Sequence, residues 1–141
     1  MNTHKPKILE SKAIIRFQHC DPFGHLNNSI YLDYFINARE DQLDQFYGVN
    51  LYQESLKSKN GWVVASHSIK YIKPIKVMNE VIIRTKLIDF TNKSVTINGE
   101  MIKDGIVHCS LISTFVYISL LNGRPTEHEA EWMALFQEVK N

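Results

Sequence analysis

The chain has 141 residues, of which 44% are hydrophobic and 22% charged, a composition ordinary for one soluble globular domain that buries its own core. Its net charge of +1 gives no argument for binding to nucleic acid or to an anionic membrane surface. The two cysteines, Cys20 and Cys109, form neither a disulfide framework nor a zinc-ligand spacing, which fits a reducing cytosol. We therefore expect a cytoplasmic protein with no metal site and no nucleic-acid or membrane partner.

The N-terminal third predicts a strand, a turn and one long helix. Residues 1–12 are polar with scattered lysines and lack the apolar run of a secretory signal, so we expect a frayed lead-in. Residues 13–17 predict a short strand. Residues 29–48 predict a helix whose apolar face, projected at about 100° per residue, covers most of the circumference, as in a buried helix. Gly48 suits a left-handed cap at the end of this helix.

Strands dominate the rest of the chain. After a possible short helix over residues 51–57, hydrophobic side chains recur with a period of two, which is typical of strands. The expected strands cover residues 62–71, 81–89, 94–101 and 106–120. Asp104-Gly105 is a hairpin signal between the last two. Residues 126–139 predict a terminal helix that starts with a capping box of Thr126 and Glu129.

This order of elements predicts an α+β fold in a single domain over residues 1–141. Strands joined by short turns should pair antiparallel. A curved antiparallel sheet wrapped around one helix is the simplest way to bury a helix that is apolar on most sides. Such a sheet covers only part of the helix and leaves two open edges, so a symmetric dimer is expected.

Residues 21–28, Asp-Pro-Phe-Gly-His-Leu-Asn-Asn, carry the strongest functional signal. The Asp21 carboxylate and the His25 imidazole precede the long helix, whose first backbone N–H groups lack helical partners. An acid or base beside such donors is half of the machinery of an acyl-transfer site, because the donors stabilise a developing oxyanion. Asn27 and Asn28 are suited to cap the helix and thereby to hold the donors in place.

This segment, together with Tyr31, Ala38-Arg39 and Tyr71-Ile72-Lys73-Pro74, resembles the hotdog-fold acyl-CoA thioesterases, and most closely the 4-hydroxybenzoyl-CoA thioesterase-like group. The resemblance covers residues 13–121 and leaves the terminal helix outside the common core. It implies a homodimer or a dimer of dimers with coenzyme A bound across the subunit interface. It implies no metal and no cofactor beyond the coenzyme A of the substrate.

The resemblance also implies roles for two residues of the loop. Asp21 would act on the thioester as nucleophile or general base, and the backbone N–H of Asn28 would polarise the thioester carbonyl. The alternative for Asp21 is an Asx turn, because Asp-Pro-x-Gly is good turn chemistry by itself.

Neighbouring side chains are candidates for supporting roles at this site. His25 either orients a water or the thioester oxygen, or is a loop histidine bonded to backbone. Phe23, Asn27 and Tyr31 are candidates for substrate binding. Tyr31 fits the hydrophobic core equally well, and Asn27 is otherwise a capping residue.

Several candidates lie outside the loop or allow a plain structural explanation. His67, on an apolar strand face, contacts substrate or is a hydrogen-bonded core histidine. Lys70 and Lys73, like Arg84, either meet the coenzyme A phosphates or are ordinary surface cations. Arg39 projects onto the apolar arc of the helix, where an ion pair or a carbonyl clamp should offset its charge. Cys20 is expected to fill core rather than to act as a nucleophile.

The sequence therefore predicts hydrolysis of an acyl-CoA, or of an acyl group on another pantetheine carrier. Two other functions remain open. One is non-catalytic binding of an acyl thioester, and the other is hydration or dehydration of an enoyl thioester with His25 taking part. Release of free thiol from a panel of acyl-CoAs distinguishes the first function from these two.

Overall fold

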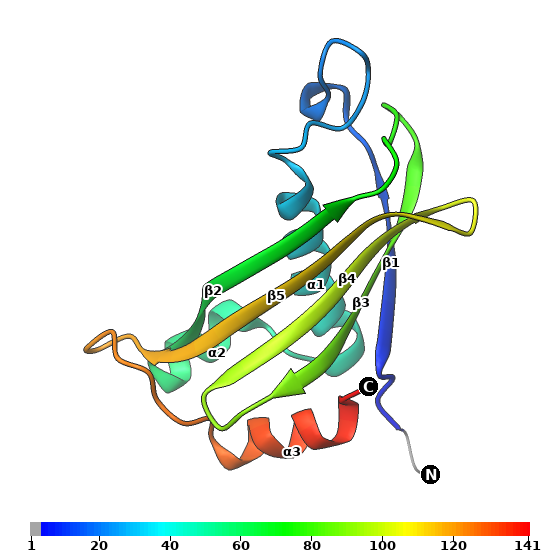
Figure 1. Ribbon diagram of the computed structural model, residues 1–141. Coiled ribbons are helices and arrows are strands. Elements are labelled where there is room, and N and C mark those ends of the chain that lie inside the picture. The colour runs from blue at the N-terminus through cyan, green and yellow to red at the C-terminus, as the bar shows by residue number, and fades with distance from the viewer. Residues whose placement is uncertain (1–3) are drawn as a thin grey trace.

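A computed structural model describes residues 4–141 as a curved five-stranded sheet with three α-helices (Figure 1). The strands are β1 (Ile8–Ile14), β2 (Asn60–Tyr71), β3 (Glu80–Phe90), β4 (Ser94–Lys103) and β5 (Ile106–Ser119). The helices are α1 (Tyr31–Tyr47), α2 (Leu51–Ser58) and α3 (Ala130–Val139), and a short 3-10 turn, η1 (Phe17–His19), precedes α1. The sheet order is β1-β3-β4-β5-β2 with every pair antiparallel, which confirms the predicted α+β architecture.

The sheet curves over α1, and α3 lies beside the end of the sheet where β3 turns into β4 (Figure 1). Strands β3, β4 and β5 form the expected meander. The turn between β4 and β5 has positive φ angles at Asp104 (53°) and Gly105 (75°), as a two-residue hairpin of type I′ requires. The predicted hairpin is confirmed.

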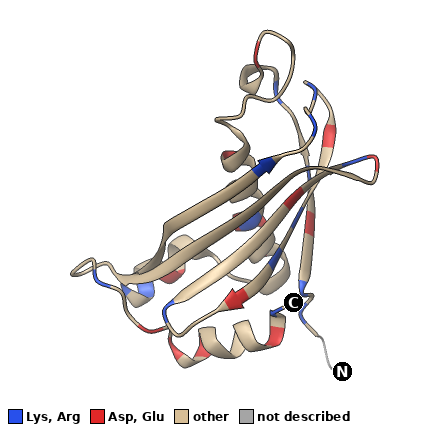
Figure 2. Ribbon diagram, viewed as in Figure 1, with Lys and Arg blue, Asp and Glu red and all other residues tan. Residues whose placement is uncertain are grey.

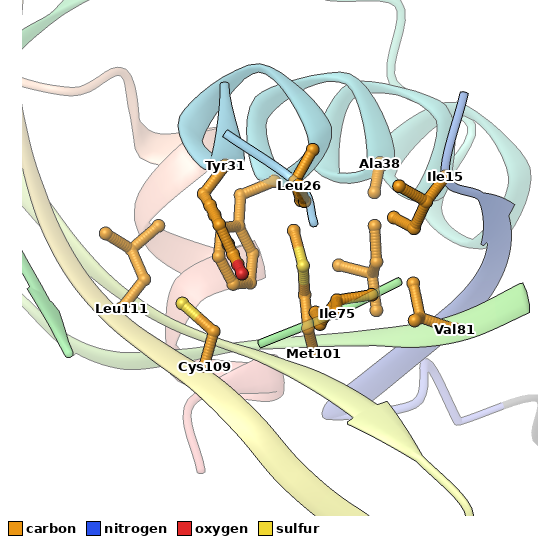
Figure 3. Close-up of a cluster of buried hydrophobic side chains, with 11 residues drawn as sticks. Ile15, Leu26, Tyr31, Ala38, Ile75, Val81, Met101, Cys109 and Leu111 are labelled. Atoms are coloured by element: carbon orange, nitrogen blue, oxygen red, sulfur yellow. The ribbon is translucent and has the colours of Figure 1, made fainter. Parts of the chain in front are cut away.

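One face of α1 packs on the sheet. Its buried residues, Tyr31, Phe35, Ala38 and Gln42, recur at helical spacing. The Phe35 ring lies over Gly99 of β4, where an added Cβ would be only 2.8 Å from a ring carbon. Figure 3 shows part of this cluster, with side chains from α1 and the preceding loop facing side chains from the strands. The labelled residues are Ile15, Leu26, Tyr31, Ala38, Ile75, Val81, Met101, Cys109 and Leu111.

A smaller part of the circumference of α1 is buried than the sequence predicts. Ile36, on the far side of the helix, is 42% exposed, so in the single chain α1 is not buried over most of its circumference. The outer edge of β2 has no strand partner among residues 4–141, and Val63 (44%) and Val64 (47%) on it are exposed. The apolar residues that the sequence placed in the core therefore lie in part on an open surface of the single chain.

The start of α1 also differs from the prediction. The helix begins at Tyr31, after a turn, and its N-cap residue Ile30 makes no side-chain hydrogen bond to the helix. The Asn27 side chain accepts hydrogen bonds from the N–H (3.2 Å) and the hydroxyl (3.1 Å) of Ser29 instead. The predicted capping by Asn27 and Asn28 is therefore wrong, whereas Gly48 adopts the predicted left-handed cap with φ of 68°.

At the N-terminus the chain enters the sheet earlier than expected. Strand β1 covers Ile8–Ile14 rather than residues 13–17, because antiparallel pairing with β3 brings Leu9 into the core, where it is 0% exposed. The predicted lead-in is wrong over the strand, and its residues 1–3 lie outside the described part of the chain.

At the C-terminus the predicted capping box is absent. Helix α3 begins at Ala130, and Glu129 makes no side-chain cap. Its carboxylate instead accepts hydrogen bonds from the Tyr117 hydroxyl (2.7 Å) and the Asn60 amide (2.9 Å), which ties the start of α3 to the sheet. Among residues 4–141 no helix combines the length and apolarity needed to cross a membrane.

Candidate active site

The loop of residues 21–28 is a compact turn organised by the Asp21 side chain. Its Oδ1 accepts hydrogen bonds from the backbone N–H groups of Phe23 (2.9 Å) and His25 (3.1 Å). The backbone of Asp21 pairs with the same segment, donating to the His25 carbonyl (2.8 Å) and accepting from the Gly24 N–H (2.9 Å). Gly24 has a φ of 76°, which glycine adopts without strain. Asp21 thus makes the Asx turn that the sequence allowed.

This turn uses only one of the two carboxylate oxygens. Among the hydrogen bonds of residues 4–141, those to the Asp21 carboxylate all go to Oδ1, so Oδ2 keeps its lone pairs. The side chain is half-buried, and its orientation is fixed by the two N–H donors. An oriented carboxylate with one free oxygen is suited to accept a proton or to attack a carbonyl carbon.

A second segment of the chain holds the loop in place. Leu26 donates its N–H to the Ile75 carbonyl, and Val77 donates to the Gly24 carbonyl, both at 2.8 Å. His25 and Lys76 form an isolated antiparallel bridge between these two pairs. The segment 75–77 therefore positions the loop as an added strand would.

The last residue of the loop, Asn28, has a backbone N–H without a partner among residues 4–141. The Asn28 carbonyl accepts a hydrogen bond from the Tyr71 hydroxyl (3.0 Å) at the end of β2, which fixes this peptide. The Tyr71 ring makes an edge contact with Tyr31, at 5.0 Å between centroids.

Tyr31 is a core residue close to the loop. Its side chain is 2% exposed, and burial raises the pKa of its hydroxyl to about 12. The hydroxyl therefore stays protonated at neutral pH and can only donate or accept a hydrogen bond.

The other predicted loop residues occupy different environments. Phe23 is 84% exposed at the tip of the loop, and Asn27 is exposed with its side chain engaged by Ser29. The His25 side chain is half-buried, and its N–H and carbonyl both bond to Asp21. The backbone of His25 thus has a structural role, while its imidazole makes no side-chain hydrogen bond within residues 4–141.

The predicted strand residues lie along β2 and just after it. His67 bonds through Nδ1 to the Ser113 hydroxyl (2.6 Å) on the paired strand β5, as a hydrogen-bonded strand histidine would. Lys70 and Lys73 are exposed and flank Tyr71, the residue that contacts Asn28. The structure therefore brings this pair of lysines to the same end of the sheet as the loop.

Two groups of polar residues near the loop were missed from sequence. Lys76 pairs directly with His25, and only the bridge between distant segments reveals it. His19 bonds to the Tyr34 hydroxyl (2.6 Å), which also accepts from the Arg16 N–H (3.0 Å). These last three residues line an open groove of about 700 Å³ between β1 and the first turns of α1. The spacing of His19 and Tyr34 in sequence gave no signal for this contact.

Alternative chemistries find less support. Burial, and to a smaller degree the Asp21 carboxylate, raise the pKa of the Cys20 thiol, so the reactive thiolate is disfavoured. No cluster of three or more histidine, cysteine or acidic side chains suited to a metal occurs within the described residues. Figure 2 shows positive and negative residues interspersed along the strands and loops, without a broad region of one sign.

Comparison with known proteins identifies the family. A model described as the thioesterase-like superfamily matches residues 15–136. The chain belongs to this superfamily. Its fold is the hotdog fold and its class is that of thioester hydrolases. Comparison with curated proteins finds no match.

Solved structures agree with this assignment. YbaW, a probable thioesterase from Escherichia coli, is 26% identical with a TM-score of 0.80, over 94% of this chain and 99% of that one. A DHNA-CoA thioesterase from Staphylococcus aureus is 16% identical with a TM-score of 0.85, over 94% of this chain and 90% of that one. SAV2348 from Staphylococcus aureus, solved in complex with CoA, is 11% identical with a TM-score of 0.86, over 99% and 87%. The last two similarities establish the fold alone.

Proposed function

We propose that this protein hydrolyses an acyl-CoA to the free acid and coenzyme A, with Asp21 as nucleophile or general base and the Asn28 N–H as oxyanion donor. The proposal rests on the different hydrogen bonding of the two oxygens of the Asp21 carboxylate. Oδ1 is held by two backbone N–H groups, and Oδ2 has no partner among residues 4–141. Membership of the thioesterase-like superfamily supplies the reaction class.

In the proposed reaction, Oδ2 of Asp21 either deprotonates a water that attacks the thioester carbon or attacks that carbon itself. The carbonyl oxygen becomes an oxyanion, which the Asn28 N–H stabilises. The C–S bond then breaks, and coenzyme A leaves as a thiolate that is protonated by solvent. Direct attack forms an anhydride on Asp21, which a water molecule hydrolyses to regenerate the carboxylate. His25 is proposed to orient the attacking water.

The cationic residues beside the loop are proposed to bind the substrate's phosphates. Lys70 and Lys73 flank Tyr71, whose hydroxyl bonds to the Asn28 carbonyl, and Lys76 pairs with His25. Lysine ammonium groups are suitable donors for phosphate oxygens. The CoA complex of SAV2348 supports a CoA-type ligand for this fold. Phe23, Asn27, Tyr31 and His67 are proposed to contact the acyl and pantetheine parts.

We further propose that the working unit is a homodimer or a dimer of dimers. The open edge of β2 carries exposed Val63 and Val64, and an exposed apolar edge favours pairing with a second strand. A symmetric partner would extend the sheet and cover this edge. Sedimentation or light scattering measures the assembly directly.

The variant Asp21→Asn tests the catalytic role. The amide oxygen of asparagine can still accept from the N–H groups of residues 23 and 25, so the loop should fold as before, while the base is lost. We expect thiol release from acyl-CoA to fall by about 10²- to 10⁴-fold with an unchanged melting temperature. Hydrolysis by the variant at the wild-type rate would refute the role of Asp21.

A matched control removes a charge of the same type elsewhere. Asp104→Asn changes an exposed hairpin residue with φ of 53°, a conformation that asparagine also tolerates, and should leave hydrolysis unchanged. A single turnover in ¹⁸O-labelled water detects direct attack when the anhydride is hydrolysed at its Asp21 carbon. In that case the acid product carries an unlabelled oxygen from Asp21 and the label enters the Asp21 carboxylate. An activated water, or water that attacks the acyl carbon of the anhydride, labels the product instead.

A further inference from the structure

A second cavity, of about 340 Å³, lies away from the Asp21 loop. Its walls come from the C-terminal half of α1, from α3 and from the sheet, and they are almost entirely apolar. The aromatic residues Trp62, Phe115, Trp132 and Phe136 line it. At about 30 Å³ for each water-sized volume, the cavity accommodates a ligand of roughly ten non-hydrogen atoms.

Arg39 is the one charged residue among those that line this cavity. Its Nη1 donates a hydrogen bond to the Thr85 hydroxyl (2.9 Å), and Thr85 in turn donates to the Gln42 side chain. Within residues 4–141 neither a carboxylate nor a backbone carbonyl pairs with the Arg39 side chain, whereas the sequence led us to expect an ion pair or a carbonyl clamp. A guanidinium has five N–H donors, and this environment engages few of them.

The charge of Arg39 persists despite its surroundings. Burial lowers the pKa of the guanidinium from 12.5 to about 10, so the group is still protonated at neutral pH. Arg39 is half-buried, and a charge there without a counter-ion is only partly hydrated, so an anion that reaches it inside the cavity would offset the lost hydration. The apolar walls require the rest of such an anion to be apolar.

The cavity is separate from the proposed catalytic loop of the same chain. Arg39 lies eight residues beyond Tyr31, which corresponds to about 12 Å along the axis of α1. The core cluster that includes Tyr31 and Phe35 lies on the stretch of helix between them. A ligand on Arg39 therefore does not occupy the space beside Asp21 in that chain.

We propose that this cavity binds a free organic acid of medium length, with its carboxylate on the Arg39 guanidinium and its hydrocarbon chain among the aromatic residues. Arginine pairs with a carboxylate through two parallel hydrogen bonds, for which its remaining N–H groups are available. The inference does not depend on the proposed catalysis, because it concerns binding to the resting protein. Hydrolysis of an acyl thioester releases an acid of this class, so occupation of the cavity would rise with the concentration of product.

Intrinsic fluorescence reports this site directly. Trp62 and Trp132 are the two tryptophans of the sequence, and both line the cavity. Titration with decanoate at neutral pH should change their emission, and decanol serves as the uncharged probe of equal chain length. We expect decanoate to bind at least about tenfold more tightly than decanol, because charge-assisted hydrogen bonds are stronger than neutral ones. Equal affinities would overturn the proposal.

Two variants separate the charge from the cavity. Arg39→Met keeps an unbranched side chain and should lose about tenfold or more in decanoate affinity while retaining decanol binding. Ile97→Phe leaves Arg39 in place and fills part of the cavity, so it should weaken both probes alike. Decanoate binding that survives in Arg39→Met, or that is unaffected in Ile97→Phe, would overturn the proposal. Because the comparison of decanoate with decanol uses the wild-type chain, it stands even if Arg39→Met does not fold.

Discussion

The contact between Phe35 of α1 and Gly99 of β4 predicts a measurable cost for one added methyl group. A Cβ built at position 99 lies 2.8 Å and 3.0 Å from two carbons of the Phe35 ring. Carbon atoms in favourable contact are about 3.5–4.0 Å apart. Phe35 is 2% exposed and is surrounded by the core, so its ring cannot turn away into solvent. The variant Gly99→Ala must therefore push α1 away from the sheet or displace the ring.

Two opposing terms set the size of the effect. Overpacking of a filled core costs about 1–3 kcal/mol. Replacing glycine by alanine restricts the unfolded chain, which returns about 0.4–1 kcal/mol. We therefore expect Gly99→Ala to lower the free energy of unfolding by about 1–2 kcal/mol. For a chain of this length, that corresponds to a melting temperature lower by roughly 3–8 °C.

Urea denaturation and thermal unfolding measure this difference. Gly61→Ala in β2 is the matched control, because the nearest atom to its added Cβ is the Leu120 side chain at an ordinary 3.9 Å. Relief of the clash in Phe35→Leu should make Gly99→Ala less costly by about 0.5 kcal/mol or more in that background. A Gly99→Ala protein as stable as Gly61→Ala would refute the packing of α1 on β4 described above.

Two further predictions concern the site and the effect of acid. Tyr71→Phe removes the hydroxyl that holds the Asn28 carbonyl, so thiol release should fall by about 2- to 10-fold with little change in melting temperature, and unaltered turnover would contradict a positioning role. The Trp62 indole N–H donates to Nε2 of His128 (3.0 Å), and burial lowers the pKa of His128 from its ordinary 6.5. The neutral ring therefore contributes its full stabilisation of the fold above about pH 6.5, the pKa of the unfolded chain. That contribution is lost as the pH falls through the lower pKa of the folded state. Wild-type unfolding free energy should therefore decline between neutral and mildly acidic pH more steeply than that of His128→Phe, and parallel curves would contradict this reasoning.

Those parts of the fold that local chemistry decides were predictable from the sequence. Strand β5 buries Cys109, Leu111 and Tyr117, which lie on one face of the strand by the period-two pattern expected over residues 106–120. The hairpin at Asp104-Gly105 and the cap at Gly48 depend on backbone conformations that these residue types favour. Each is decided within a few neighbouring residues.

The errors arose where a distant partner outcompeted a local preference. Glu129 could have capped its own helix, but the Tyr117 hydroxyl and the Asn60 amide bind its carboxylate instead. Leu9 belongs to a segment of low local signal and enters the sheet because β3 provides a neighbour. Arg39 was expected to form an ion pair or a carbonyl clamp, but it donates to the Thr85 hydroxyl and lines an apolar cavity instead. Each of these partners lies far away in the sequence, so the pattern of one helical turn or one strand does not predict it.

The candidate site shows the same division. The loop motif that includes Asp21 and Gly24 was evident from sequence, because turn chemistry and a carboxylate occur together there. The bridge from His25 to Lys76 and the hydrogen bond from the Tyr71 hydroxyl to Asn28 join segments that are 51 and 43 residues apart, so only the structure reveals them. The sequence therefore located the chemistry but did not reveal what holds it in place.

The two interpretations of Asp21 that the sequence offered need not exclude each other. An Asx turn requires one acceptor oxygen, and Oδ1 serves the two N–H groups of the turn. Hydrogen bonds to that oxygen prevent rotation of the side chain, so they also present Oδ2 in a fixed direction. The turn thus prepares the geometry that the proposed chemistry needs. This arrangement makes asparagine the informative substitution, since it retains the acceptor on which the loop depends while removing the carboxylate on which hydrolysis would depend.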